Sequence, residues 1–205
     1  MTPKYWNKAK KELSVKDPIL AKIIKTYKGE VLRSRGDAFE TLARSIVGQQ
    51  ISVKAADSVW RKVLTLCRKV TPKKIDSLSA LALRQCGLSE RKVSYLKDLA
   101  QHFLKGKIKP SEWDQHSNEE VIAELIAVKG IGRWTAEMFL IFHLLKPDVF
   151  PAADLGLHRA ISLNYKLKYP LAPKHIKKFS TAYSPWASVA VWYLWRSLDP
   201  IPVEY

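Results

Sequence analysis

The chain has 205 residues, enough for one core or two small lobes, and its 35 lysine or arginine residues against 19 aspartate or glutamate residues give a formal net charge of +16. A charge this large favours a polyanionic partner, most commonly nucleic acid, over a basic surface that serves solubility alone. The sequence has two cysteines, Cys67 and Cys86, which excludes a disulfide framework, a four-cysteine zinc site and a four-cysteine iron–sulfur cluster.

The first predicted helices follow one another after residue 36. Asp37 and Glu40 form a capping-box pattern, and apolar side chains recur every three or four positions behind them. Ser52 caps a second amphipathic helix, and Thr71-Pro72 opens a third, short one, because proline is tolerated at the first helical position. We therefore expect three consecutive helices in this part of the chain.

The remaining predicted helices occupy the rest of the chain. Residues 89–104 are amphipathic, and Ser117 with two acidic residues behind it opens another helix. Residues 133–145 are apolar nearly all round, which predicts a buried central helix, and Ser184-Pro185 opens the last one. No strand pattern of convincing length is present, so the predicted fold class is all-α. Composition places no lobe boundary in the continuous stretch from about residue 40 to 150.

The cysteine usage and the N-terminal segment bear on the cellular compartment. Two free cysteines fit a reducing, intracellular setting. Residues 1–17 are polar and basic and lack the apolar region of a signal peptide, and the most apolar run, residues 138–145, is too short to span a bilayer. We expect no membrane association, and a location in the cytoplasm at the nucleoid in a bacterium or in the nucleus in a eukaryote.

A tight basic turn, Lys129-Gly130-Ile131-Gly132, joins two of the predicted helices. Glycine accepts unusual backbone angles and, having no Cβ, lets a foreign backbone approach closely. The helix that follows offers unpaired N–H groups at its positive end, and Lys129 and Arg133 add charge beside them. The pattern fits a phosphate-binding corner, although a glycine pair alone also fits a plain turn that binds nothing.

Four stretches in this order and spacing resemble the helix-hairpin-helix DNA glycosylase superfamily, and within it the 3-methyladenine DNA glycosylase II (AlkA) group. They are FETLARSIVGQQISVKAA, LRQCGLSERKVSYLKDLA, VKGIGRWTAEMFLIF and DVFPAADLGLHR, and SPWASVAVWYLW near the C-terminus also fits. The resemblance covers roughly residues 38–165 and implies a two-lobed helical bundle with a helix-hairpin-helix motif and a DNA-facing cleft. We expect residues 1–205 to form one such unit, a compact form without the N-terminal β-lobe of longer members.

Asp154 matches the catalytic aspartate of the superfamily. Cleavage of an N-glycosidic bond develops positive charge on the sugar, and a carboxylate held near that carbon stabilises the charge and orients the attacking water. Asp154 also precedes a helix that starts at Leu155, so it fits a capping residue. The two roles are compatible, because a capping position would hold the carboxylate rigidly.

Trp134 stands where the resemblance implies a Schiff-base lysine in lyase-type members. Without an amine at this position the expected chemistry is that of a monofunctional glycosylase, in which water displaces the base and the strand stays intact. An indole face also attracts the delocalised positive charge of N3-methyladenine or N7-methylguanine. The alternative for Trp134 is core packing. A lyase-type enzyme for oxidised bases is disfavoured by Trp134 and by the low cysteine count.

Other tryptophans lie near the C-terminus. Trp186 matches another pocket tryptophan of the group, and the resemblance implies that Trp134 and Trp186 sandwich the base, since base-acting enzymes take it out of the stack. Trp192 and Trp195 lie further along the same predicted helix, and we expect both of them in the core.

Three positions depart from the AlkA-type pattern. Met138 and Leu155 stand where that enzyme has pocket tyrosines, which predicts a more open or more apolar base pocket. Gln50 stands at the wedge position, where a side chain fills the gap left by the extruded nucleotide, and replaces a leucine there. Gln49 is expected to be structural, and Ser52 to cap the next helix.

The resemblance also implies a structural monovalent cation at the hairpin, Na⁺ or K⁺, held by the backbone carbonyls of Ile126, Val128 and Ile131 and bridging to a DNA phosphate. No cofactor is expected for catalysis. The five histidines lack metal-ligand spacing, and His143 is expected to be an ordinary core or surface histidine.

Together these features predict a base-excision repair glycosylase that flips alkylated purines out of damaged double-stranded DNA and releases them, acting as a monomer. The alternative is a non-catalytic helix-hairpin-helix protein that binds DNA without regard to sequence. The expected phosphate contacts come from the hairpin, residues 129–133. Asp154 and its companion tryptophans are the features that favour the enzyme.

Overall fold

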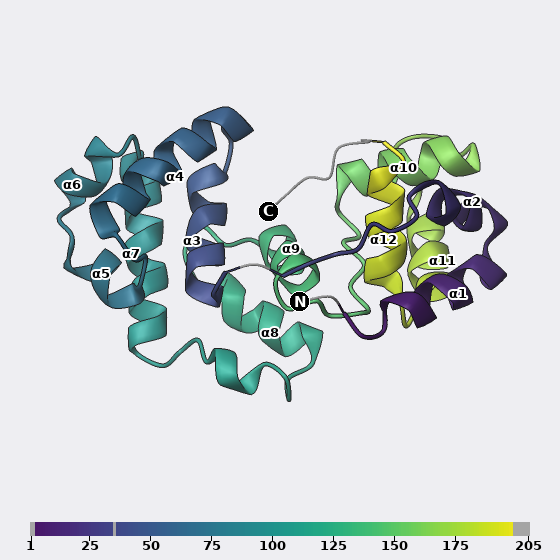
Figure 1. Cartoon of the computed structure of the whole chain (residues 1–205), viewed down its shortest axis with the longest axis horizontal. Helices are drawn as coiled ribbons and strands as arrows, with labels where there is room; N and C mark the ends of the chain where they lie inside the picture. Colours follow the sequence, from purple (N-terminus) through teal and green to yellow (C-terminus); the bar gives the residue numbers. More distant parts are fainter. Residues whose placement is uncertain (1–2, 35, 199–205) are drawn as a thin grey trace. The chain divides into compact units, whose positions relative to one another are not determined.

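The computed structural model of the chain describes residues 3–34 and 36–198. Within these residues every regular element is helical, which confirms the predicted all-α class (Figure 1). In chain order the elements are α1 (Trp6–Lys16), α2 (Pro18–Thr26), α3 (Ala38–Gly48), α4 (Val53–Cys67), α5 (Pro72–Ser77), α6 (Ala80–Gln85), α7 (Glu90–Leu104), the 3-10 turn η1 (Pro110–Glu112), α8 (Asn118–Ile126), α9 (Arg133–Phe142), α10 (Leu155–Tyr165), α11 (Pro173–Tyr183) and α12 (Ala187–Arg196). None of the helices in this part of the chain has the length and apolar character that a bilayer span requires.

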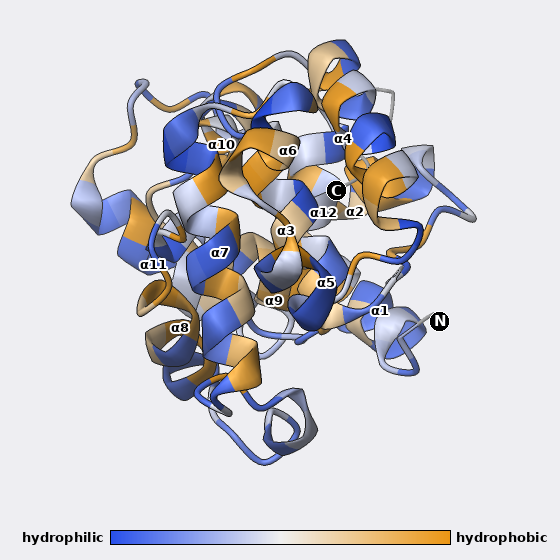
Figure 2. Ribbon diagram, turned by 90° about the vertical axis from the view of Figure 1, so that its left-hand side faces the viewer, coloured by the Kyte–Doolittle hydropathy of each residue, from blue (hydrophilic) through white to orange (hydrophobic). Residues whose placement is uncertain are grey.

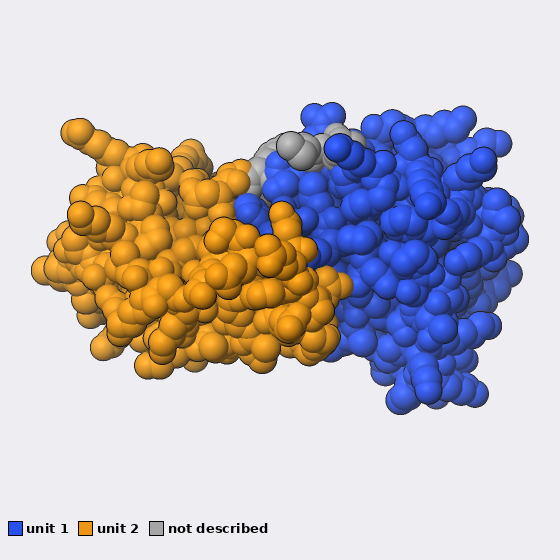
Figure 3. Space-filling view, turned by 90° about the horizontal axis from the view of Figure 1, so that it is seen from below, with its two compact units in different colours: residues 1–34, 140–205 blue, residues 35–139 orange. Residues whose placement is uncertain are grey.

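The described helices gather into two compact units (Figure 3). Unit 1 combines the residues up to Ser34 with those from Leu140 onward, and unit 2 consists of the residues between them. Composition placed no boundary in the stretch from about residue 40 to 150. In the structure the second boundary falls inside that stretch, within α9, because the last three residues of this helix pack with unit 1.

Unit 2 is built around α7. This helix packs against α3, α5 and α6, and its inward side chains Leu96 and Leu99 are completely buried. The amphipathic pattern that predicted these helices is visible in Figure 2 as alternating orange and blue along α4 and α7. Burial of such an apolar stripe, rather than helix propensity alone, accounts for most of the stability of helices of this length.

The side-chain caps predicted for four helices of unit 2 are confirmed. Asp37 accepts a hydrogen bond from the backbone N–H of Glu40, and Ser52 and Thr71 cap α4 and α5 in the same way. The reciprocal capping box occurs at Ser117, whose hydroxyl accepts from the backbone of Glu120 while the Glu120 carboxylate accepts from the backbone of Ser117. Each cap satisfies a backbone donor that the helix leaves unpaired.

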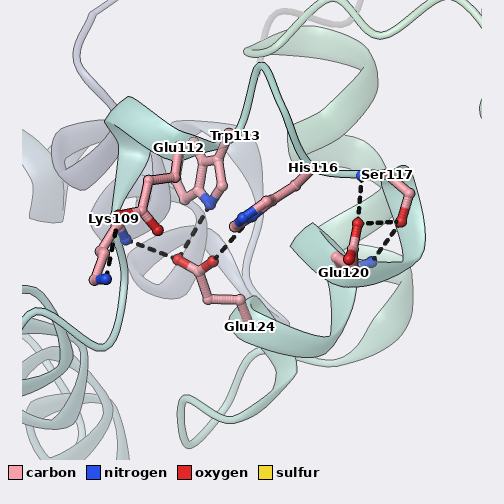
Figure 4. A network of polar contacts seen from close by, with 7 residues as sticks. All are labelled: Lys109, Glu112, Trp113, His116, Ser117, Glu120 and Glu124. Carbon is pink, nitrogen blue, oxygen red and sulfur yellow. Dashed lines mark hydrogen bonds and ion pairs between the residues drawn. The ribbon is translucent and has the colours of Figure 1, made fainter.

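The segment that leads into α8 is fixed by the carboxylate of Glu124 (Figure 4). One carboxylate oxygen accepts from the backbone N–H of Lys109 at 2.8 Å and from the indole N–H of Trp113 at 3.1 Å. The other oxygen lies 3.9 Å from Nδ1 of His116. Trp113 itself is almost fully buried. The network therefore ties α8, the first helix of the hairpin, to the segment that precedes it.

Unit 1 is built around α12, which packs against α1, α2, α10 and α11. Its residues from Ala187 to Leu194 are all buried, and Trp192 meets the ring of Trp6 edge to face, with 5.3 Å between the ring centroids. This part of α12 confirms Trp192 as a core residue. The N-terminal helices α1 and α2 and the helix α11 are not among the helices predicted from the sequence.

Helix α9 is shorter than the sequence predicts, ending at Phe142 rather than near residue 145. Its middle residues, 136–141, are buried, as expected of a central helix. The chain then turns, and the backbone N–H of Lys146 donates to the carbonyl of Leu140. The apolar residues that follow Phe142 extend the sequence pattern but not the helix.

Candidate DNA-contacting and catalytic residues

The hairpin of unit 2 joins α8 to α9 through residues 127–132. Gly130 adopts φ of +84°, a conformation that L-residues with side chains rarely take. The backbone N–H of Lys129 donates to the carboxylate of Asp98 on α7 at 2.8 Å. The Lys129 side chain is exposed, whereas Ile131 is buried, so only the backbone of Ile131 is available to a ligand. The turn is thus held from one side by α7.

Arg133, the first residue of α9, is engaged by two carboxylates. Its guanidinium forms a bidentate ion pair with Glu119 of α8, and Nε donates to Glu137 at 3.2 Å. The hydrogen bonds from Arg133 hold the pKa of the Glu119 carboxyl below its usual range. A DNA phosphate that reached Arg133 would have to compete with both acids. Lys129 is therefore the stronger of the two predicted side-chain contacts.

The loop after α3 contacts the hairpin directly. The side-chain amide of Gln49 donates to the carbonyl of Gly130 at 2.8 Å, which gives Gln49 the structural role expected of it. Gln50, the predicted wedge residue, is exposed at φ of +58°. Lys92 of α7 donates to the carbonyl of Val47 at 2.7 Å, and burial lowers the pKa of this ammonium. The loop that presents Gln50 is therefore tied to the hairpin, and the end of α3, from which this loop leaves, is tied to α7.

The three carbonyls predicted to hold a cation differ in their partners. The carbonyl of Val128 accepts from the backbone N–H of Ile131 at 3.1 Å, which leaves it one lone pair. Across the described residues, no backbone N–H donates to the carbonyl of Ile126 or of Ile131. Carbonyl oxygens of this kind suit a hard cation, so the donor set fits the predicted ion.

Asp154 lies in unit 1 at the N-terminus of α10. It is 9% exposed, and its Oδ1 atom accepts from the backbone N–H of Leu157 at 2.5 Å, which confirms it as the N-cap of this helix. The same oxygen accepts from the indole N–H of Trp195 at 2.9 Å. The start of α10 and the end of α12 thus fix this carboxylate together.

Trp195 differs from the core residue that the sequence predicts. It is half-buried, and its ring stacks on Phe142 with 5.8 Å between centroids and 13° between planes. The expectation that it belongs simply to the core is wrong, because its indole N–H faces Asp154. No local signal reveals this contact, since the two residues are 41 positions apart in the chain.

His158 is a second residue beside Asp154 that sequence reasoning did not single out. Its Nε2 lies 2.8 Å from the carbonyl oxygen of Ala152. A carbonyl can only accept, so Nε2 carries the proton and donates it. The ring is buried, and Nδ1 has no hydrogen-bond partner among the described residues. His158 therefore bridges α10 to the turn that precedes Asp154.

Trp186 precedes α12 in unit 1 and is held by α1. Its indole N–H donates to Glu12 at 2.6 Å, and its ring stacks on Tyr5 with 5.7 Å between centroids. Burial raises the pKa of Tyr5 to about 12, and its hydroxyl donates to the carbonyl of Leu145. The ammonium of Lys8 lies 5.9 Å from the Trp186 ring centroid. Sequence reasoning missed Tyr5 and Glu12, because nothing near them in the chain points to Trp186.

The remaining predicted pocket residues divide between the units. Trp134 and Met138 belong to α9 in unit 2, and Leu155 follows Asp154 in unit 1. Trp134 is 42% exposed, which contradicts the alternative that it is a core residue. Met138 is buried, whereas Leu155 is 65% exposed. In each unit, then, an exposed apolar side chain lies within the sequence motif that carries the resemblance.

These features define a class of protein, an all-helical protein with a helix-hairpin-helix motif and an aspartate that caps a later helix. The chain belongs to the HhH-GPD superfamily of base excision DNA repair proteins, whose family model matches residues 43–184. The resemblance drawn from the sequence is thereby confirmed.

Named relatives are close in sequence and structure. DNA-3-methyladenine glycosylase 1 of Schizosaccharomyces pombe is 33% identical over 182 residues, which cover 87% of this chain and 80% of that protein. The crystal structure of DNA-3-methyladenine glycosidase from Bacillus halodurans matches with a TM-score of 0.81 at 32% identity, over 91% of this chain and 87% of that one. The S. pombe 3-methyladenine DNA glycosylase Mag1, solved in complex with abasic DNA, matches with a TM-score of 0.76 at 32% identity, over 93% and 96%.

Proposed function

We propose that the protein is a monofunctional DNA glycosylase of base excision repair. It binds damaged double-stranded DNA as a monomer, flips an alkylated purine such as N3-methyladenine or N7-methylguanine out of the helix, and hydrolyses its N-glycosidic bond. The observation that carries this proposal is the buried carboxylate of Asp154, fixed by two donors at the start of α10. Similarity to relatives named as 3-methyladenine glycosylases supports the substrate class.

The proposed reaction exchanges one bond to the sugar for another. The bond between C1′ and the purine nitrogen breaks, and the electron pair leaves with the base, which is neutral once it departs because its alkylated form was a cation. The sugar passes through a cationic state that the Asp154 carboxylate stabilises. Water then bonds to C1′ and loses a proton, which leaves an abasic site in an intact strand. A cationic base is a good leaving group, so no strong general acid is required.

Unit 2 supplies the residues that we propose contact the DNA backbone. The exposed Lys129 ammonium and the N-terminus of α9 suit a phosphate, and Gln50 is the proposed wedge. Trp134 offers an exposed indole face to a cationic base. We further propose that Na⁺ or K⁺ binds at the carbonyls of Ile126, Val128 and Ile131. The ion would be structural and would support the contact with phosphate.

The test is a base-release assay on a duplex that carries one N7-methylguanine, with abasic sites revealed as strand breaks after alkali. Asp154→Asn keeps the shape of the side chain and a good capping residue but removes the charge. We expect release by this variant to fall by about two orders of magnitude or more, while affinity for an abasic duplex persists.

Two outcomes would contradict the proposal. Near-normal release by Asp154→Asn would refute the catalytic assignment of this residue. Tight DNA binding by the unmodified protein, with no release of any alkylated purine from dimethyl-sulfate-treated DNA, would favour the non-catalytic DNA-binding alternative.

A further inference from the structure

The indole of Trp195 is placed to do more than fill space at the end of α12. Its Nε1–H donates to Oδ1 of Asp154 at 2.9 Å, the same oxygen that accepts from the backbone of Leu157. Two donors on one oxygen fix both the direction of the carboxylate and the rotation about its last bond. The N-terminus of α10 provides one donor through its backbone, but the other depends on a side chain.

The identity of that side chain matters chemically. An indole N–H can only donate a hydrogen bond, and it does not titrate in the physiological range. Its interaction with the charged carboxylate is therefore favourable at every physiological pH. A hydrogen bond to an ionised group is also stronger than one between neutral groups. The partner is thus suited to keep an aspartate charged and oriented in a largely buried place.

The surroundings hold the indole in position for this contact. The ring of Phe142, at the end of α9, lies nearly parallel to that of Trp195, with 13° between the planes. Stacking of this kind limits rotation of the indole. Phe142 therefore holds the indole so that its N–H is directed at Asp154, although its own ring has no polar group to contact the carboxylate.

Gly156 provides the space in which carboxylate and indole meet. A Cβ atom built on this residue would lie 3.1 Å from Oδ1 of Asp154 and 3.6 Å from Nε1 of Trp195. The first distance is tighter than an ordinary carbon–oxygen contact, so a side chain here would require the carboxylate to shift by a few tenths of an ångström. The backbone of Gly156 does not require glycine, since its φ is not in the left-handed region. Glycine at this position therefore leaves room for the contact beside it.

We infer that Trp195 is a positioning residue for the reaction, with Phe142 fixing its ring and Gly156 leaving room for its N–H to reach Asp154. This inference rests on the proposed function, because it assigns Asp154 to the stabilisation of the cationic sugar. It predicts that loss of the N–H impairs the chemical step and leaves DNA binding unchanged.

The test compares three variants by single-turnover release of N7-methylguanine and by affinity for an abasic duplex. Trp195→Phe keeps an aromatic ring for the stack but removes the donor. Gly156→Ala leaves the donor in place and crowds the carboxylate, so it tests the same contact if Trp195→Phe folds poorly. Trp192→Phe is the matched control, because it removes a buried indole from the same helix. Thermal unfolding of each variant reports the effect on stability.

We expect the rate constant to fall about tenfold or more in Trp195→Phe and in Gly156→Ala, as the loss of a hydrogen bond to a charged group predicts. Affinity for the abasic duplex stays within about twofold, and Trp192→Phe releases base within about twofold of the unmodified rate.

A rate for Trp195→Phe within twofold of the unmodified protein would overturn the inference, as would a parallel loss of rate and affinity, which indicates a merely structural role. These results require an active unmodified protein. An unmodified protein that releases no base contradicts the proposed function itself, and the inference falls with it.

Discussion

The ring of Tyr95 occupies the place that a side chain at position 130 would take. A Cβ atom built on Gly130 would lie 2.1 Å from Cδ2 of that ring, and the residue has φ of +84°. Around Gly132, two residues later, no such atom would meet a neighbour within 4 Å. The two glycines of the hairpin therefore have different roles. Gly130 is required by the packing of the protein, and Gly132 leaves the surface open.

This difference separates folding from binding at the hairpin. Gly130→Ala should lower the free energy of unfolding by about 1–3 kcal/mol, because both the backbone angle and the space are wrong for a methyl group. The free energy of unfolding of Gly132→Ala should lie within about 0.5 kcal/mol of that of the unmodified protein. This variant should nevertheless bind duplex DNA more weakly, since a methyl group keeps a phosphate from the backbone. Chemical denaturation and fluorescence anisotropy measure the two effects. Unimpaired binding by Gly132→Ala would mean that no phosphate approaches there.

The identity of residue 134, a tryptophan, predicts the product of the reaction. With no amine at this position, the unmodified protein should leave an intact strand with an abasic site, and borohydride should trap no covalent protein–DNA adduct. Trp134→Ala should lower the affinity for duplexes that contain a cationic base, an effect of about 0.5–2 kcal/mol for a cation–π contact. Gel analysis of the strand with and without alkali tests the first point. Efficient trapping of the unmodified protein would show that another amine attacks the sugar.

Much of the fold follows from local sequence signals. Asp37, Ser52, Thr71 and Ser117 each reveal a helix start, because a cap is a contact between residues three positions apart. Helix α2 carries the same kind of signal in Asp17, whose carboxylate accepts from the backbone N–H groups of Ile19 and Leu20, yet it was not predicted. Helix α11 follows Ala172, which provides no side-chain cap, so only its proline marks its start.

The candidate site is less accessible to sequence reasoning, because its contacts join distant segments. The resemblance to the superfamily motif points to Asp154, but Trp195 reaches it across 41 positions. The amide of Gln49 meets the hairpin carbonyl across 81 positions. Arg133 was expected to meet phosphate because of its charge. Its partner Glu137 lies four residues later on the same helix, but its partner Glu119 is evident only once α8 and α9 are placed side by side. Residue type and motif therefore nominate a candidate group, but they do not show which distant side chains hold it in place.

His158 provides a prediction about the turn before Asp154. Its Nε2–H is the donor to the carbonyl of Ala152, so His158→Leu leaves that carbonyl without this partner, whereas His158→Gln retains an amide donor of similar reach. We expect His158→Leu to lower the free energy of unfolding by about 1–3 kcal/mol and to release base more slowly. His158→Gln should be intermediate in both the free energy of unfolding and the rate of release. Denaturation curves and single-turnover rates are the measurements. Equal behaviour of the two variants would argue that the ring acts by packing alone.

The ion pair between Arg133 and Glu119 predicts a dependence of stability on pH. The guanidinium hydrogen bonds lower the folded-state pKa of Glu119 below its ordinary value of 4.5. The pair therefore contributes stability that is complete above the unfolded-state pKa and is lost as the pH falls through the folded-state pKa. The side chain of Glu119 is 69% exposed and that of Arg133 is 55% exposed. The ion pair should therefore contribute only about 0.2–1 kcal/mol to the free energy of unfolding at pH 7. Glu119→Gln should remove it.

Denaturation of Glu119→Gln and the unmodified protein across the acid range measures this contribution. Their difference in unfolding free energy should shrink toward zero as the pH falls below the folded-state pKa. A difference that grows toward low pH would show that Glu119 stabilises the protein by some other means.

Unit 1 is assembled from the two ends of the chain, and this has a consequence for its synthesis. Helices α1 and α2 pack against α12, and Glu30 pairs with Arg196 across 166 positions. A ribosome makes all of unit 2 before α12 exists, so α1 and α2 can pack on each other during that interval, but the surfaces that they present to α12 stay uncovered. Unit 2 has its whole sequence available first and can complete its folding on the nascent chain. Helices α1 and α2 are therefore made before unit 2 but acquire their contacts with α12 only after it.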